Sequence, residues 1–145
     1  MKREEVIKFA KDNPICFLST VYKNTPYVRT IPVWFADDTG IYFEILSLKE
    51  LSKHLRFNPQ VEVCFISNID EIDASYEMRL SGKLELITNE QIINEAYRSE
   101  PVQDEYLSQE RKPNVEVYRL THGDARLLQL KNQGINEEVI HHTLF

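Results

Sequence analysis

Four short apolar runs lie close together in the first half of the chain, and they constrain the fold more than any other feature of the sequence. The runs cover residues 15–21, 27–35, 41–46 and 61–66. Turn-forming residues separate the first three runs, at 23–26 and again at 37–40. Two hairpins followed by a helix and a return strand are typical of a small antiparallel barrel.

The other segments extend this pattern along the chain. An apolar stripe at Val6, Ile7 and Ala10 predicts a helix over residues 2–12, which ends before Pro14 because the residue preceding a proline avoids the helical conformation. Residues 76–87 alternate between apolar and polar, which is typical of a half-exposed antiparallel strand. Further predicted elements are a helix from Ser47 to Asn58, a polar loop over 67–75, a helix opening at Thr88, a short helix around 102–107, a hairpin of 115–120 with 125–130 across Thr121–Asp124, and a short helix from Asn136.

Two of these predictions depend on local motifs. Ser47–Glu50 and Thr88–Gln91 both match the capping-box pattern, so Ser47 and Thr88 are the expected N-caps of their helices. Strand 27–35 is apolar on both faces and must be covered on both, by the barrel core on one side and by a second subunit, a ligand or packed helices on the other. Pro32 donates no ladder hydrogen bond, which indicates a sheet edge or a bulge.

Composition narrows the class of protein. The 145 residues predict one domain over 1–145, and a net charge of −6 argues against nucleic acid and anionic membrane as partners. No apolar stretch approaches the roughly 20 residues of a membrane span. The N-terminus is amphipathic rather than signal-like, and Cys16 and Cys64 lie inside predicted strands. We therefore expect a cytoplasmic protein with two buried thiols, a disulfide between them being the alternative.

The common catalytic and metal-binding motifs are absent from the sequence. The four glycines form neither a dinucleotide-binding fingerprint nor a phosphate-binding loop. The four histidines do not have the spacing of metal ligands, and neither HExxH nor GxSxG occurs. No catalytic residue and no metal ligand is predicted, so any phosphate-bearing ligand would be held by side chains and a helix end.

Two cationic residues occupy positions that a strand and a helix do not favour for a positive charge. Arg29 shares its strand face with Ile31 and needs an anionic partner or an opening to solvent. Lys49 is expected in the first turn of a helix, where the helix dipole disfavours a cation unless a phosphate binds the free N–H groups there. The alternatives are that Arg29 pairs with an acid on a neighbouring strand and that Lys49 is merely exposed.

A family resemblance connects these features. Several segments carry the resemblance, and they occur in order and with similar spacing from about residue 2 to residue 130. They are Phe17-Leu-Ser-Thr-Val21, Pro26-Tyr-Val-Arg-Thr30, Ile41-Tyr-Phe43, Lys49 with Asn58-Pro59 and Val61-Glu-Val-Cys64, Arg79-Leu-Ser-Gly-Lys83 and His122-Gly-Asp-Ala125. Together they resemble the pyridoxamine 5′-phosphate oxidase-like FMN-binding split barrels, and among these the small nitroimidazole-resistance-like members. The fold implied is α+β, a mainly antiparallel split β-barrel with flanking helices.

The resemblance also implies a function. It is that of a flavoprotein, an oxidoreductase that uses FMN on a small-molecule substrate at a homodimer interface. Arg29 and Lys49 match the phosphate-binding cations of the family. The implied cofactor-binding set is completed by the Ser47 hydroxyl, towards the phosphate, and by the backbone of Thr30, Ile31, Tyr42, Phe43 and Glu44, towards the flavin ring.

Two residues depart from the family pattern and leave alternatives open. Ile45 stands where many relatives carry a threonine, and the Glu44 carboxylate would oppose a bound anion. The runner-up reading is therefore a split-barrel binding module that holds haem, a deazaflavin or no cofactor. A third reading is an unrelated structural or interaction protein with a barrel-like core.

Overall fold

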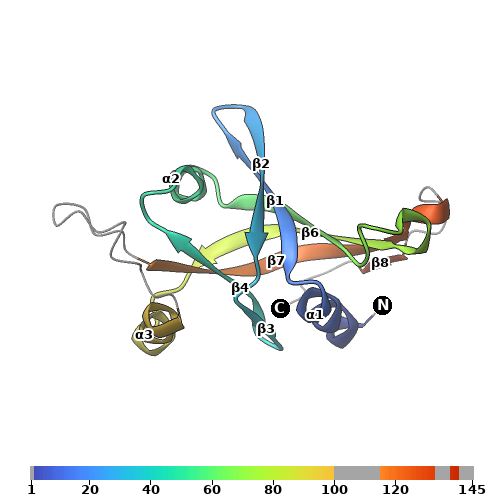
Figure 1. Cartoon of the computed structure of the whole chain (residues 1–145). Helices are drawn as coiled ribbons and strands as arrows, with labels where there is room; N and C mark the ends of the chain where they lie inside the picture. The colour runs from blue at the N-terminus through green and yellow to red at the C-terminus, as the bar shows by residue number, and fades with distance from the viewer. Residues whose placement is uncertain (1, 100–114, 133–137, 141–145) are drawn as a thin grey trace.

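A single antiparallel sheet that curls into an open barrel dominates the computed structural model, which describes residues 2–99, 115–132 and 138–140 (Figure 1). The strand order is β2-β1-β5-β6-β7-β4-β3, and β8 pairs with β7. The elements are α1 Arg3–Asp12, β1 Ile15–Tyr22, β2 Thr25–Pro32, β3 Phe35–Asp37, β4 Gly40–Leu46, α2 Glu50–Phe57, β5 Gln60–Ile66, η1 Ile72–Ala74, β6 Tyr76–Leu86, α3 Glu90–Ser99, β7 Val115–Gln129, η3 Leu130–Asn132 and β8 Glu138–Ile140. The predicted α+β split-barrel fold is confirmed.

The inward faces of the strands form one hydrophobic core. Its fully buried members include Leu18, Phe43, Val63, Phe65 and Leu80, and α1 and α2 add their apolar stripes to it. Burying one such side chain contributes roughly 1.5–3 kcal/mol. A smaller cluster on the outer face of β4 and β7 is covered by α3.

Both predicted hairpin turns are present. Lys23 and Asn24 have φ values of 48° and 63°, and they link β1 to β2 through a two-residue loop that suits the twist of the two strands. In the second turn the Asp37 carboxylate accepts a hydrogen bond of 2.8 Å from the amide of Thr39. These turns fix the register that places Arg29 and Ile31 on the inward face of β2.

The prediction of one continuous strand over 27–35 is wrong. The strand ends at Pro32, as its lack of an N–H favours, and β3 begins at Phe35. β2 is a terminal strand of the sheet, which confirms the edge position inferred from Pro32. The outward face of β2 stays open, with the Val28 side chain 71% exposed. The strand covered on both faces is instead β4, with Phe43 in the barrel core and Tyr42 in the outer cluster.

The predicted hairpin at 121–124 is also wrong. β7 runs unbroken from Val115 to Gln129, and the glycine lies in a β-bulge where β7 has two residues opposite the single Gly82 of β6. A Cβ atom on Gly123 would lie 1.5 Å from the carbonyl oxygen of Ser81. Glycine is required because the backbones of β6 and β7 approach so closely.

Neither of the two helices begins at its predicted N-cap residue. The N-cap of α2 is Lys49, without a side-chain capping bond, so the helix begins after the predicted Ser47 cap. Asn89, rather than Thr88, caps α3, because its side-chain oxygen accepts a bond of 3.2 Å from the amide of Ile92. Helix α2 ends at Asn58, as the following proline favours.

The C-terminal predictions have mixed outcomes. The short helix around 102–107 lies outside the described residues. The helix expected from Asn136 is wrong where the chain is described, because Glu138–Ile140 form β8 against β7. Both cysteines are free thiols, but only Cys16 is buried; Cys64 is half-buried, so the prediction of two buried thiols is wrong for Cys64. Among the described residues, no helix is long and apolar enough to span a membrane.

Candidate functional site

A cavity of about 160 Å³ lies at the split of the barrel, between β2, β4 and the start of α2. β2 pairs only with β1, and β3 accompanies β4 only as far as Tyr42. Beyond Tyr42, the edge of β4 away from β7 has no partner among the described strands. The edges of two strands, β2 and β4, therefore border the cavity. Its lining residues are Thr30, Ile31, Pro32, Glu44, Ile45, Leu46, Lys49, Leu51 and Val115.

Four of the eight predicted cofactor-binding residues line this cavity: Thr30, Ile31, Glu44 and Lys49. Lys49 is the N-cap of α2, and its side chain is exposed and makes no ion pair with another described residue. Glu44 brings a carboxylate to the same wall. The cavity thus combines one cation, one anion and a helix N-terminus.

The side chains of three other predicted residues lie elsewhere. Phe43 is fully buried in the barrel core. Tyr42 stacks on Phe35 on the outer face, with ring centroids 4.1 Å apart, and its hydroxyl bonds to Thr39. Ser47 lies in the turn that precedes α2 rather than at its N-cap. Since the prediction for Tyr42 and Phe43 concerns their backbone, these side-chain positions leave it open.

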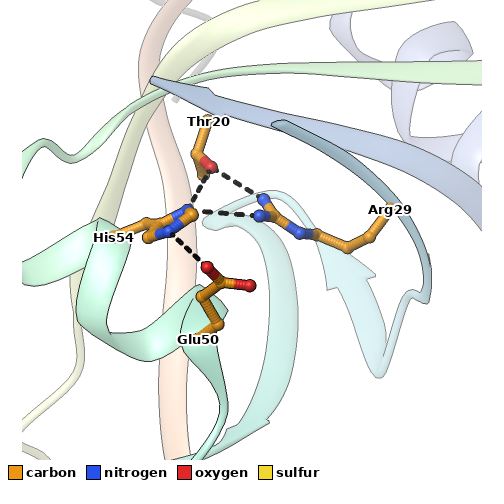
Figure 2. A network of polar contacts seen from close by, with 4 residues as sticks. All are labelled: Thr20, Arg29, Glu50 and His54. Atoms are coloured by element: carbon orange, nitrogen blue, oxygen red, sulfur yellow. Dashed lines mark hydrogen bonds and ion pairs between the residues drawn. The ribbon is translucent and has the colours of Figure 1, made fainter. Parts of the chain in front are cut away.

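The eighth predicted residue, Arg29, reaches towards α2 beside the cavity and is not among its lining residues (Figure 2). Its guanidinium donates a hydrogen bond of 2.8 Å to Thr20 Oγ1 and lies 3.3 Å from Nδ1 of His54. Burial lowers the pKa of Arg29, and the negative charge of Glu50 opposes that shift. Arg29 therefore interacts with a histidine and a threonine, and with no acid on a neighbouring strand in the part of the chain that the structure describes.

Sequence reasoning missed Thr20 and His54 as parts of this site. His54 lies on the apolar face of α2, and Thr20 is the one buried polar side chain of β1. Both side chains are almost completely buried. A histidine within an apolar helix face, four residues after Glu50, was the available signal.

A second polar cluster attaches α2 to β7. The Glu116 carboxylate accepts hydrogen bonds of 2.7 Å from Ser52 Oγ and 2.7 Å from the Tyr118 hydroxyl, and Arg56 also donates to it. Burial raises the pKa of Glu116, but the bonds from Ser52, Tyr118 and Arg56 outweigh this effect and lower it overall. Burial and the bond to Glu116 raise the pKa of Tyr118 to about 12. Tyr118 is therefore a neutral hydrogen-bond donor.

The described residues contain no metal-ligand cluster, and Thr30 is the hydroxyl-bearing residue among those that line the cavity. The Ile45 side chain is 2% exposed and belongs to the barrel core, so position 45 offers no polar group to a ligand. The polar chemistry of the site comes from Lys49, Glu44, the strand edges and the neighbouring Arg29.

The fold and the cavity define a class: a split barrel with a small cavity between β2, β4 and the start of α2. The sequence model of a family described as pyridoxamine 5′-phosphate oxidase matches residues 3–129. The chain therefore belongs to the pyridoxamine 5′-phosphate oxidase family, as its resemblance had predicted. No curated protein matches the sequence.

Solved structures share the fold at low identity. A NimC/NimA family protein from Clostridium acetobutylicum is 18% identical with a TM-score of 0.72, covering 97% of this chain and 91% of its own. A heme binding protein from Mycobacterium smegmatis is 14% identical with a TM-score of 0.70, covering 95% and 57%. A pyridoxamine 5′-phosphate oxidase-related, FMN binding protein from Nostoc punctiforme is 17% identical with a TM-score of 0.62, covering 96% of each chain.

Proposed function

We propose that this chain is a flavoprotein that binds FMN in the cavity at the split of the barrel and acts as an oxidoreductase on a small molecule at a homodimer interface. One observation carries the proposal: a helix start with an exposed lysine and the edges of two strands meet at one cavity. Membership of the family and the FMN-binding relative from Nostoc punctiforme support it.

The phosphate of FMN suits the α2 side of the cavity. The first N–H groups of a helix and its dipole favour an anion, and the Lys49 ammonium adds a full positive charge. Arg29 shares the inward face of β2 with Ile31, which lines the cavity, and would provide a second cation on that side. Charge-assisted hydrogen bonds contribute about 1.5–3 kcal/mol each, so two of them outweigh the opposing carboxylate of Glu44 in a solvent-accessible site.

The flavin ring suits the strand edges. Backbone groups of Thr30 and Ile31 on β2, and of Tyr42–Glu44 on β4, provide donors and acceptors for the polar edge of a flat heterocycle. Bound FMN would supply the hydride or electron transfer, and the protein would supply binding and orientation. Such chemistry requires no nucleophilic side chain, in agreement with the absence of a catalytic motif in the sequence.

The homodimer is proposed because one chain forms only part of a cofactor site. The cavity of about 160 Å³ is smaller than the roughly 300–1,000 Å³ of typical small-molecule sites. Apolar side chains on the outer face of the adjoining hairpin are open to solvent, with Val28 71% and Ile15 55% exposed. A second chain packed there would bury these residues and enlarge the wall around the ligand.

The first test compares Lys49→Ala with Lys53→Ala. Both variants remove one exposed lysine near the start of the same helix, but only Lys49 lines the cavity. The wild-type protein should bind FMN with the visible absorption of a flavin. FMN affinity should fall about tenfold or more in Lys49→Ala, the cost of one charge-assisted contact, and stay within about twofold in Lys53→Ala.

Three results would contradict the proposal. Failure of the wild-type protein to bind FMN with a Kd below about 100 μM would end the flavin assignment. A Soret band in place of flavin absorption would favour the haem-binding alternative. A monomer by light scattering, with and without FMN, would remove the homodimer from the proposal.

A further inference from the structure

The most completely buried polar ring among the described residues is His54, and its surroundings point to a specific role. The side chain is 0% exposed. Tyr22 stacks on one face, with ring centroids 4.6 Å apart and an angle of 10°, and the Tyr27 ring lies 4.5 Å away. A buried imidazole enclosed by aromatic rings must place its nitrogens against defined partners, because an unpaired buried polar atom is costly.

The partners of His54 determine the orientation of its donor and acceptor. Arg29 only donates, so Nδ1 of His54, 3.3 Å away, faces it as an acceptor. Thr20 accepts from Arg29 at 2.8 Å, which leaves its own hydroxyl proton to donate to the same Nδ1 at 3.0 Å. The ring proton therefore resides on Nε2, which lies 3.4 Å from Glu50 Oε1 and forms no hydrogen bond with a described residue (Figure 2).

This arrangement places the imidazole ring against two opposite charges. The Nδ1 side of the ring faces the guanidinium of Arg29, and the Nε2 side faces the carboxylate of Glu50. Arg29 and Glu50 form no ion pair with each other. Without the imidazole, the two side chains would be free to pair directly, as arginine and carboxylate groups strongly tend to do. Arg29 would then be neutralised.

The anchored Arg29 keeps most of its donors for other acceptors. A guanidinium has five N–H groups in a rigid fork, and Thr20 and His54 engage only two of them. The side chain is also fixed before any ligand arrives, so less rotamer freedom is lost when an anion binds. Arg29 shares the inward face of β2 with Ile31, which lines the cavity, so this fixed cation lies on the cavity side of the strand.

We propose that His54 and Thr20 are positioning residues that give the cofactor site its selectivity for a phosphorylated flavin, by holding the guanidinium of Arg29 in place and apart from Glu50. The inference rests on the proposed FMN site. His54 and Thr20 would act through Arg29, so they would affect the binding of the ligand's phosphate and not the binding of its ring.

FMN and riboflavin separate this role from a general structural one, since they differ only in the phosphate. We would measure the Kd of both ligands for the wild-type protein and three variants. His54→Phe keeps an aromatic ring between Tyr22 and Tyr27 but removes the acceptor. Thr20→Val keeps the shape of the side chain but removes its hydroxyl. His54→Asn keeps an amide oxygen near the position of Nδ1 and serves as the conservative rescue.

FMN affinity should fall about tenfold or more in His54→Phe and several-fold in Thr20→Val, while riboflavin affinity stays within about twofold. His54→Asn should retain most of the preference for FMN. Equal losses for both ligands would show that His54 only supports the fold, and unchanged FMN affinity in His54→Phe would overturn the proposal. If His54→Phe does not fold, Thr20→Val and His54→Asn decide the same question.

A second measurement keeps this inference distinct from the flavin assignment. Nitrogen NMR shifts of the ligand-free protein report which ring nitrogen of His54 carries the proton and whether the Arg29 guanidinium is held rigidly. A proton on Nε2 and a rigid Arg29 that becomes mobile in Thr20→Val support the positioning role, even if wild-type protein fails to bind FMN and the proposed function is lost. A proton on Nδ1, or an equally mobile Arg29 in both proteins, would refute it.

Discussion

Glu116 is the acceptor that attaches α2 to the sheet, and replacing it should destabilise the protein in a graded and pH-dependent way. The hydroxyls of Ser52 and Tyr118 both donate to the same oxygen, Oε2, while Arg56 donates to Oε1. Ser52 is 0% exposed and Tyr118 is 3% exposed, so neither hydroxyl can turn to bulk water when its acceptor is removed.

The size of the effect follows from these contacts. Glu116→Ala leaves two buried hydroxyls unpaired, at about 1–3 kcal/mol each, while the exposed ion pair with Arg56 adds little. We expect a total loss of about 2–6 kcal/mol, a large part of the roughly 5–15 kcal/mol that holds a domain of this size together. Glu116→Gln offers an amide oxygen at the position of Oε2, keeps both hydroxyl contacts and should cost only about 1–2 kcal/mol.

The dependence on pH has a definite sign. Because its folded-state pKa lies below the ordinary value of 4.5, the Glu116 carboxylate takes up a proton more readily in the unfolded chain. Its charge therefore stabilises the fold at neutral pH, and this contribution is lost as the pH falls below 4.5 and through the folded-state value. The gap between wild type and Glu116→Gln should be largest near neutral pH and close in acid.

Urea denaturation followed by circular dichroism measures both effects, at neutral pH and at several points in the acid range. The reasoning is refuted if Glu116→Ala loses less than about 1 kcal/mol at neutral pH, since two unpaired buried hydroxyls cannot cost so little. A gap between wild type and Glu116→Gln that does not change with pH would show that the charge of Glu116 contributes nothing to stability.

Two further predictions concern the strands. Gly123→Ala should lower the free energy of unfolding by more than about 4 kcal/mol or prevent folding, because its Cβ would lie 1.5 Å from the backbone oxygen of Ser81. Arg126→Ala, at an exposed position on the same strand, should be nearly neutral. Equal urea midpoints for the two variants would disprove the bulge. Burial raises the pKa of Cys16 to about 12 and that of Cys64 to about 11. Iodoacetamide at mildly alkaline pH should therefore label both thiols far more slowly in the native protein than in denaturant. Labelling of either thiol at the rate of a free thiol would contradict its burial.

Local sequence signals predicted most of the barrel because strands and their ends are encoded over short distances. Apolar runs located β1, β4, β5 and β6 to within a residue or two, and Asn-Pro pairs marked the ends of α1 and α2. The hairpin prediction at 121–124 failed because the deciding contact is not local. Gly123 and its polar neighbours have the composition of a hairpin turn, and only the approach of Ser81 on another strand reveals a bulge.

The candidate site was less predictable than the barrel. Lys49 and Thr30 were found because a cation at a helix start and a family motif are visible locally. The partners of Arg29 were not predicted, because Thr20 and His54 are 34 positions apart in the sequence and each has the pattern of an ordinary member of an apolar face. An apolar pattern says which face of an element is buried, but it does not say which polar group within that face meets another.

The two polar clusters explain how a short helix can position a binding site. Glu50 and His54 lie one turn apart on α2, as do Ser52 and Arg56, and a shift of two residues turns the second pair about 200° around the helix axis. One pair faces the β1–β2 hairpin and the other faces β7, which is paired with β4. Helix α2 is thus held from opposite sides, by elements that belong to the two borders of the cavity. The position of Lys49 relative to both borders is therefore determined by buried polar contacts, because hydrophobic packing alone is not directional enough to fix it.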